Sequence, residues 1–296
     1  IVTDDAFLPV ISAADPEDDW KSPDTWHKAH PGLGVSVKVD YFESECAKAI
    51  ALPSYENTFR RLLLNQWTEQ DQRWLSLDAW AECEQELPDL AGLPCYAALD
   101  LSSTTDLSAL VLAFPIGPLV HLLPFFWIPG DGIERRVRRD RVPVDTWVAK
   151  GLVEATTGPV IDYDVIRTRI NELAEKYEIR EIAIDRWNAT QLSTQLAGDG
   201  FTVYPFGQGF ASMAAPCQEF EKRVIGKTLN HGGNAVLRWM ASNVTVEIDA
   251  AGNMKPSKAK STERIDGIVA SIMALGRVIA SQETEAPFAR GEFVFV

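Results

Sequence analysis

The amino-acid sequence predicts an α/β protein with a mixed sheet, antiparallel in its first strands and parallel afterwards, flanked by helices. Three apolar segments follow one another between residues 95 and 128 with only short turns between them, which favours an antiparallel meander. After residue 162, strand-like segments alternate with segments of helical periodicity. Strands that alternate with helices call for a sheet covered on both faces. A segment without a continuous strand pattern precedes the sheet and is expected to be mostly helical.

The meander is expected to contain strands over 95–102, 107–114 and 119–128. Gly117 and Pro118 separate the second strand from the third, and this pair is typical of a hairpin turn.

Helix and strand signals alternate in the second half of the chain. Apolar residues at helical spacing predict a helix over 163–177, with Asp162 or Asp164 available as its N-cap. The elements expected after it are a strand over 180–187, a helix over 188–200, a strand over 201–206, a strand that enters a turn within 243–256, and a long helix over 261–281. An apolar stripe with i, i+3, i+4, i+7 spacing in the last helix is the face expected to pack on the sheet.

Composition divides the chain into three zones. Residues 1–86 are rich in Trp, Asp and Pro and resemble an adaptor more than a complete domain. Residues 87–282 carry the alternating strands and helices, and residues 283–296 are expected to form a loose tail. The chain opens with "IVTDD" and no initiator Met, which suggests a processed or truncated piece of a longer protein.

Composition also excludes several classes of protein. No apolar run approaches the roughly 20 residues of a membrane span, so no membrane partner is expected. Four scattered cysteines without a CxxC pair, and a start unlike a secretory signal, favour a reducing cytoplasm. The net charge of −14 argues against nucleic acid, yet residues 134–141 and 255–264 form two basic patches. Each patch alone is more simply explained as a solvated surface.

Three aspartates are candidates for a metal site. Asp100 and Asp185 each end an apolar strand, at the sheet edge where ligands gather in α/β proteins. Asp266 lies in the first turn of the last helix, where stabilisation by the helix dipole explains it equally well without function. Together they would supply the oxygen ligands of two Mg²⁺ or Mn²⁺ ions that cleave a phosphodiester by in-line attack of water.

Other catalytic motifs are missing from the sequence. The "GKT" at 226–228 resembles the end of a phosphate-binding loop, but Glu221 stands where its first glycine would be required. The sequence contains no GxSxG, and its four histidines form no HExxH or zinc-finger spacing. No ATP site is therefore expected in this chain.

The order of the three acids resembles a known family. "ALDLSSTTD", "IAIDRWNA" and "STERIDGIVASIMAL" are similar to the motifs of the ribonuclease H-like nuclease domain in the large terminase subunit of tailed double-stranded DNA bacteriophages. Residues 231–275 resemble the closing stretch of that domain almost position by position. Residues 15–34 and 59–70 are similar to the segment that joins the packaging ATPase of the family to its nuclease.

This resemblance implies a ribonuclease H-like fold and a role in viral genome packaging. Motors of this family pump concatemeric double-stranded DNA into a procapsid, and their nuclease cuts the DNA at the start and the finish. The implied partners are double-stranded DNA, the small terminase subunit and the portal protein of the procapsid, in the host cytoplasm at the portal. Because the chain lacks Walker motifs, residues 1–86 correspond to the linker and the end of the ATPase region. ATP hydrolysis is expected only of the intact protein.

Carried over by position, Asp100, Asp185 and Asp266 are the expected catalytic residues and metal ligands, for two Mg²⁺ or Mn²⁺ ions. Asp106 also matches the motif loop. It either contacts a metal ligand without binding the metal itself or caps the next strand. The DNA backbone is expected to contact the basic residues that precede the last helix, without readout of the base sequence: Lys255, Lys258, Lys260 and Arg264. Two alternatives stay open: a resolvase-type or transposase-type nuclease of the same fold, and a catalytically silent module that docks on DNA or the portal.

Overall fold

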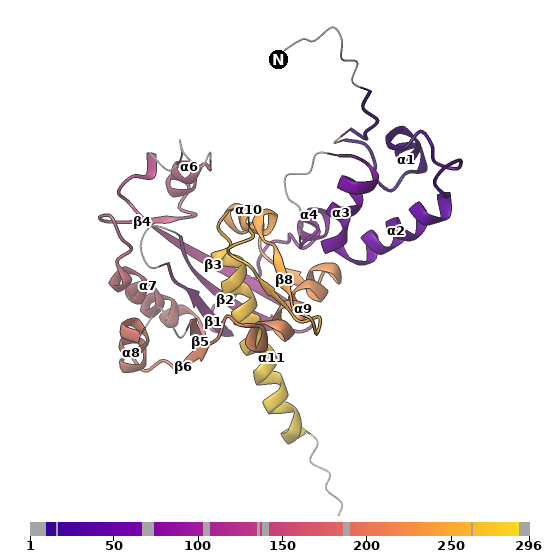
Figure 1. The fold of residues 1–296 in the computed structure, drawn as a ribbon. Coiled ribbons are helices and arrows are strands. Elements are labelled where there is room, and N and C mark those ends of the chain that lie inside the picture. Colours follow the sequence, from indigo (N-terminus) through magenta and orange to yellow (C-terminus); the bar gives the residue numbers. More distant parts are fainter. Residues whose placement is uncertain are drawn as a thin grey trace, which may run out of the picture. The chain divides into compact units, whose positions relative to one another are not determined.

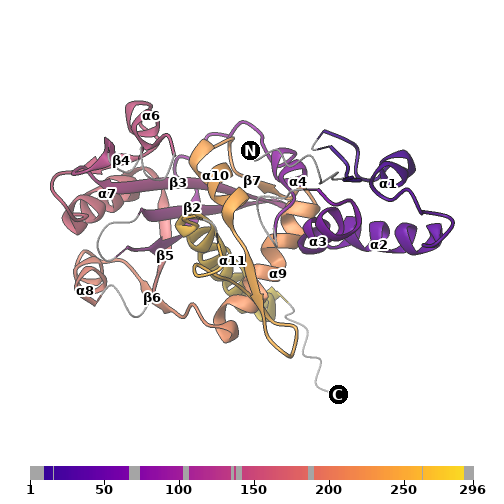
Figure 2. The same cartoon turned by 45° about the horizontal axis from the view of Figure 1, so that its top comes forward.

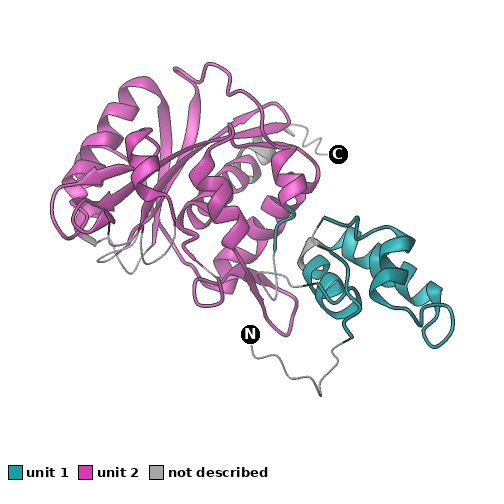
Figure 3. Cartoon of the chain, turned by 90° about the horizontal axis from the view of Figure 1, so that it is seen from above, with its two compact units in different colours: residues 1–76 teal, residues 77–296 magenta. Residues whose placement is uncertain are grey.

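The computed structural model describes residues 10–15, 17–66, 74–102, 107–134, 137, 142–185, 190–261 and 263–289. The chain forms two compact units, residues 1–76 and 77–296 (Figure 3). This division falls ten residues before the boundary expected at 86, because the short helix α4 (Leu77–Ala81) packs within the second unit. The Trp80 ring of α4 stacks on the His231 ring at 4.3 Å, and His231 Nε2 lies 2.7 Å from the Trp80 carbonyl oxygen.

The first unit is helical, with α1 (Pro23–Ala29), α2 (Val39–Ala51) and α3 (Pro53–Leu63) around an aromatic core. The Ser22 hydroxyl caps α1 by accepting a hydrogen bond from the backbone N–H of Asp24. The rings that meet in the core belong to Trp20, Trp26, Phe42 and Phe59. These large buried rings give the short segment a hydrophobic cluster of its own.

The second unit is built on a mixed sheet with the strand order β4-β3-β2-β1-β5-β6, with β7 paired to β3 (Figures 1 and 2). Strands β1, β2 and β3 are antiparallel, whereas β5 is parallel to β1 and β6 is parallel to β5. The predicted mixed sheet is confirmed. The strands are β1 (Pro94–Asp100), β2 (Ser108–Ile116), β3 (Leu119–Pro129), β4 (Glu154–Thr156), β5 (Glu178–Asp185), β6 (Val203–Phe206) and β7 (Leu229–Asn230).

Helices cover both faces of this sheet. On one face, α7 (Tyr163–Lys176) buries Ile166 and Ile170 in a core that includes Leu99 of β1 and Ile184 of β5. On the other face, α11 (Asp266–Ala289) lies against β1 and β2 (Figure 2). The remaining helices are α6 (Val144–Ala149), α8 (Thr190–Gly198), α9 (Phe210–Ile225) and α10 (Ala235–Asn243), and a separate hairpin is formed by β8 (Val246–Ile248) and β9 (Met254–Pro256).

Some elements differ from the sequence-based expectation. The last helix begins at Asp266 and not at 261, and it continues to Ala289, past the expected start of the tail at 283. Residues 257–261 form a turn, in which the Ser261 hydroxyl donates to the Ser257 carbonyl. The two- and three-residue strands β7 and β4 were not predicted, since so few residues carry no periodic signal. Among the described residues, no helix combines the length and apolar character needed to cross a membrane.

Candidate metal centre

Two of the candidate acids end neighbouring strands of the sheet. Leu99 of β1 is in register with Ile184 of β5, so Asp100 and Asp185 follow at adjacent positions on the same sheet edge. Leu99 and Ile184 both face the core under α7. Because side chains alternate along a strand, Asp100 and Asp185 point to the opposite face, toward α11. Strand register therefore places the two carboxylates on one side of the sheet.

The third acid is brought to the same face by a close helix–sheet contact. Asp266 is the first residue of α11, and the residue is buried with an exposure of 5%. The next residue is Gly267, whose backbone N–H lies 3.0 Å from the sulfur of Met240 in α10. A Cβ atom at Gly267 would lie 2.7 Å from the ring of Phe126 in β3. The missing side chain thus allows α11 to begin directly on the sheet, which buries Asp266.

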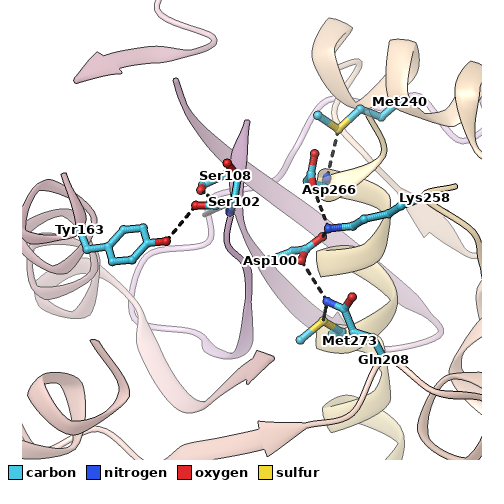
Figure 4. Close-up of polar contacts among 10 residues, drawn as sticks. Asp100, Ser102, Ser108, Tyr163, Gln208, Met240, Lys258, Asp266 and Met273 are labelled. Carbon is cyan, nitrogen blue, oxygen red and sulfur yellow. Dashed lines mark hydrogen bonds and ion pairs between the residues drawn. The ribbon is translucent and has the colours of Figure 1, made fainter. Parts of the chain in front are cut away.

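A lysine joins two of the acids, as Figure 4 shows. Lys258 Nζ lies 2.7 Å from Asp100 Oδ2 and 2.9 Å from Asp266 Oδ1. Asp100 is only 1% exposed to solvent, whereas the side chain of Lys258 is 47% exposed. The ammonium therefore contacts two buried carboxylates from a stem that is open to solvent. The sequence predicted Lys258 as a DNA contact and carried no sign of these ion pairs.

Gln208 is a site residue that the sequence did not reveal. Its side-chain amide donates to Asp100 Oδ1 at 3.0 Å, on the oxygen opposite to the one that Lys258 contacts. Gln208 lies between β6 and α9, in the segment "GQGF". A polar residue between two glycines directly after a strand was the available signal. Its partner is 108 positions away, so the pair was not foreseeable.

Burial and charge act on the protonation of these groups. Burial, together with the nearby charge of Asp100, raises the pKa of Asp266 to about 6, although Lys258 opposes this shift. Burial alone would lower the pKa of Lys258, but the charges of Asp100 and Asp266 outweigh it and raise that pKa. The lysine accordingly stays charged between the two carboxylates across the neutral pH range.

The donor set suits a hard cation at Asp100 and Asp266. Their buried carboxylates already share one positive charge, and carboxylate oxygens are the ligands that Mg²⁺ and Mn²⁺ prefer. Asp185 is partly buried at the adjacent strand end. Among the described residues, however, no three Asp, Glu, His or Cys side chains are grouped closely enough to hold a metal ion. The fourth acid considered, Asp106, lies outside the described residues.

The other basic residues expected at DNA lie beside this centre along the chain. Lys255 of β9 pairs with Glu247 at 3.4 Å and lies 5.2 Å from the centroid of the Phe210 ring. Lys260 is exposed, and Arg264 pairs with Glu263 at 2.8 Å. Most of the other basic patch, 134–141, lies outside the described residues.

Comparison with known proteins decides the family. The family model described as "Terminase large subunit, endonuclease domain" matches residues 1–282. The chain belongs to this family. The resemblance seen in the sequence is thereby confirmed, and the mixed sheet flanked by helices is the ribonuclease H-like fold of terminase nuclease domains.

Two relatives and one solved structure match this terminase nuclease domain over most of its length. It is 37% identical to the terminase large subunit of Enterobacteria phage HK97 over 256 residues, which cover 86% of this chain and 51% of that protein. It is 29% identical over 299 residues to protein YmfN of Escherichia coli K12, covering 96% of this chain and 66% of that protein. The crystal structure of the HK97 large terminase matches with a TM-score of 0.66 and 35% identity, over 90% of this chain and 56% of that one. The chain thus spans about half the length of its HK97 relative.

Proposed function

We propose that this chain is the metal-dependent endonuclease of a viral DNA-packaging motor, which cuts concatemeric double-stranded phage DNA by hydrolysis of phosphodiester bonds. The observation that carries the proposal is the pair of buried carboxylates, Asp100 and Asp266, drawn together around one positive charge. We propose Asp185, at the end of the neighbouring strand β5, as the third acid of the site. Family membership supports the nuclease assignment.

In this proposal the three aspartates hold Mg²⁺ or Mn²⁺. Two such ions, when bound, would stabilise the charge on the attacking and leaving oxygens of the scissile phosphodiester. The chain itself contributes rigidity, because Asp100 and Asp185 are fixed on adjacent strands and Asp266 on a helix packed against them. Gln208 fixes the Asp100 carboxylate by its hydrogen bond to Oδ1. Ligands held in place in this way need no reorganisation when substrate binds.

DNA binding is proposed for the basic segment before α11. Lys255, Lys260 and Arg264 all lie within eleven residues of Asp266, and Lys260 is exposed. Contacts of such side chains to phosphates would position a duplex beside the acids without reading its sequence. They would also offset locally the net charge of −14, which otherwise repels nucleic acid.

The whole-protein functions are proposals by relation to the family. Since the chain spans about half of its HK97 relative, ATP-driven translocation belongs in the proposal to the intact protein. The proposed partners are the small terminase subunit and the portal protein of the procapsid, in the host cytoplasm. The helical unit of residues 1–76 is proposed to be the linker from the ATPase region.

A second candidate is a catalytically silent docking module. It is favoured by one observation, namely that no three potential ligands are grouped as a metal site among the described residues. Metal-dependent cleavage separates the two functions.

The test is cleavage of supercoiled plasmid by the purified chain with Mn²⁺ or Mg²⁺. We expect nicked and linear products, and we expect Asp185→Asn to lower the rate by at least about 100-fold because it removes a metal-ligand charge. Asp131→Asn is the matched control, since Asp131 is an exposed aspartate after β3, and it should cleave at the wild-type rate. Cleavage by Asp185→Asn at the wild-type rate would refute the site assignment. A folded wild type inert with both metals would favour the docking module.

A further inference from the structure

We propose that Lys258 is an internal counterion of the acidic centre, which a divalent metal must displace in order to bind. The inference rests on the proposed metal role of Asp100 and Asp266. Its basis is a direct overlap of partners: the Lys258 ammonium already contacts Asp100 Oδ2 and Asp266 Oδ1 (Figure 4). A cation held by the same two carboxylates would lie close to the ammonium, and the two positive charges repel each other. The metal and the ammonium therefore compete for one place.

The two carboxylates need a counterion whenever no metal is bound. Asp100 and Asp266 are 1% and 5% exposed, so water cannot compensate their charges. Ionised carboxylates buried close together repel each other, and each loses its hydration. Gln208 compensates part of the loss at Asp100 with one hydrogen bond but brings no positive charge. Lys258 supplies the charge, which allows the metal-free site to stay folded with both acids in place.

The Lys258 side chain can move away from the two carboxylates. It is 47% exposed, so the four-carbon stem can swing toward solvent. The turn that carries it is held by contacts that do not use the ammonium. The backbone N–H of Ser257 donates to the Thr245 carbonyl at 2.9 Å, and the Ser261 N–H donates to the Ser257 carbonyl at 3.0 Å. Displacement of the ammonium thus leaves the backbone of residues 257–261 intact. Because the metal must break two ion pairs in order to bind, the free energy of breaking them lowers the affinity of the site for the metal.

The experiment compares Lys258→Met with Lys260→Met in the 296-residue chain. Lys260 lies on the same turn, and its change alters the net charge equally, but Lys260 forms no ion pair with Asp100 or Asp266 within the described structure. Thermal unfolding without metal and calorimetric titration with Mn²⁺ are measured for each protein. For Lys258→Met we expect a metal-free melting temperature lower by about 5 °C or more, because two buried charges lose their partner. We expect its Mn²⁺ affinity to rise by about tenfold or more. Lys260→Met should match the wild type in both measurements.

Several outcomes would overturn the inference. An unchanged or weaker Mn²⁺ affinity of Lys258→Met would do so, as would equal shifts in both lysine variants or a lack of Mn²⁺ binding by all three proteins. If Lys258→Met folds only when Mn²⁺ is added, competition for the site is supported. If Lys258→Met does not fold at all, the wild type is tested by NMR. The ammonium ¹H–¹⁵N signal of Lys258 should be protected from exchange without metal and lost on addition of Mg²⁺. A signal that persists with Mg²⁺ would refute the displacement of Lys258. Tight Mn²⁺ binding without plasmid cleavage would contradict the proposed nuclease function and leave the role of Lys258 standing.

Discussion

Substitution of Gly267 by alanine tests how the acidic centre is assembled. A Cβ atom at this position would lie 2.7 Å from the Phe126 ring, 2.9 Å from the Met240 sulfur and 3.0 Å from a Leu237 methyl group. All three neighbours belong to buried residues, so the first turn of α11 must move away from the sheet. Overpacking of this kind costs about 1–3 kcal/mol, while replacement of a helical glycine returns up to about 1 kcal/mol. The expected net loss is about 1–2 kcal/mol.

The free energy of unfolding is measured by urea denaturation, with plasmid cleavage in Mn²⁺ as a second readout. Gly198→Ala is the matched control, because Gly198 ends α8 and a Cβ atom there would meet nothing within 4 Å. The control should be as stable as the wild type or slightly more stable. Gly267→Ala should lose stability and cleave more slowly, since Asp266 moves with the helix start. If Gly267→Ala is as stable and as active as the wild type, the close approach of α11 does not position Asp266.

Two further predictions concern side chains around the sheet. Gln208→Ala should weaken activation of cleavage by Mn²⁺ about tenfold, because Asp100 loses the hydrogen bond that orients it. Gln191→Ala is the control, since Gln191 is exposed, and equal Mn²⁺ activation curves for the two variants would refute the role of Gln208. Arg167 and Asn171 hold the pKa of Asp199 down to about 2, so this carboxylate stabilises the fold above its ordinary pKa of 3.8 and the contribution is lost as the pH falls toward 2. The difference in melting temperature between wild type and Arg167→Met should therefore be largest near pH 5 and shrink toward pH 2, and a difference independent of pH would contradict this pairing.

The sequence was most informative where apolar runs end in acids. Asp100 and Asp185 close strands whose apolar character predicted the strands, and the register of Leu99 with Ile184 places the two acids at the same end of neighbouring strands. Asp266 was identified at the start of an apolar-striped helix, although its burial depends on Gly267, which a helical pattern does not single out.

The sequence did not predict contacts between residues that are far apart along the chain. Lys258 is eight residues from Asp266 but 158 from Asp100, and nothing in "KPSKAKSTER" distinguishes it from Lys255 or Lys260. Only the turn at 257–261 brings its ammonium to both acids. The stack of Trp80 on His231 is a contact of the same kind, because the two residues are 151 positions apart.

The most direct measurement is a crystal structure of the chain soaked in Mn²⁺, with the metal located by its anomalous scattering. The account predicts anomalous density between the carboxylates of Asp100 and Asp266, with Asp185 at its side and the Lys258 ammonium withdrawn toward solvent. Density elsewhere, or none while Lys258 keeps both ion pairs at saturating Mn²⁺, would contradict it.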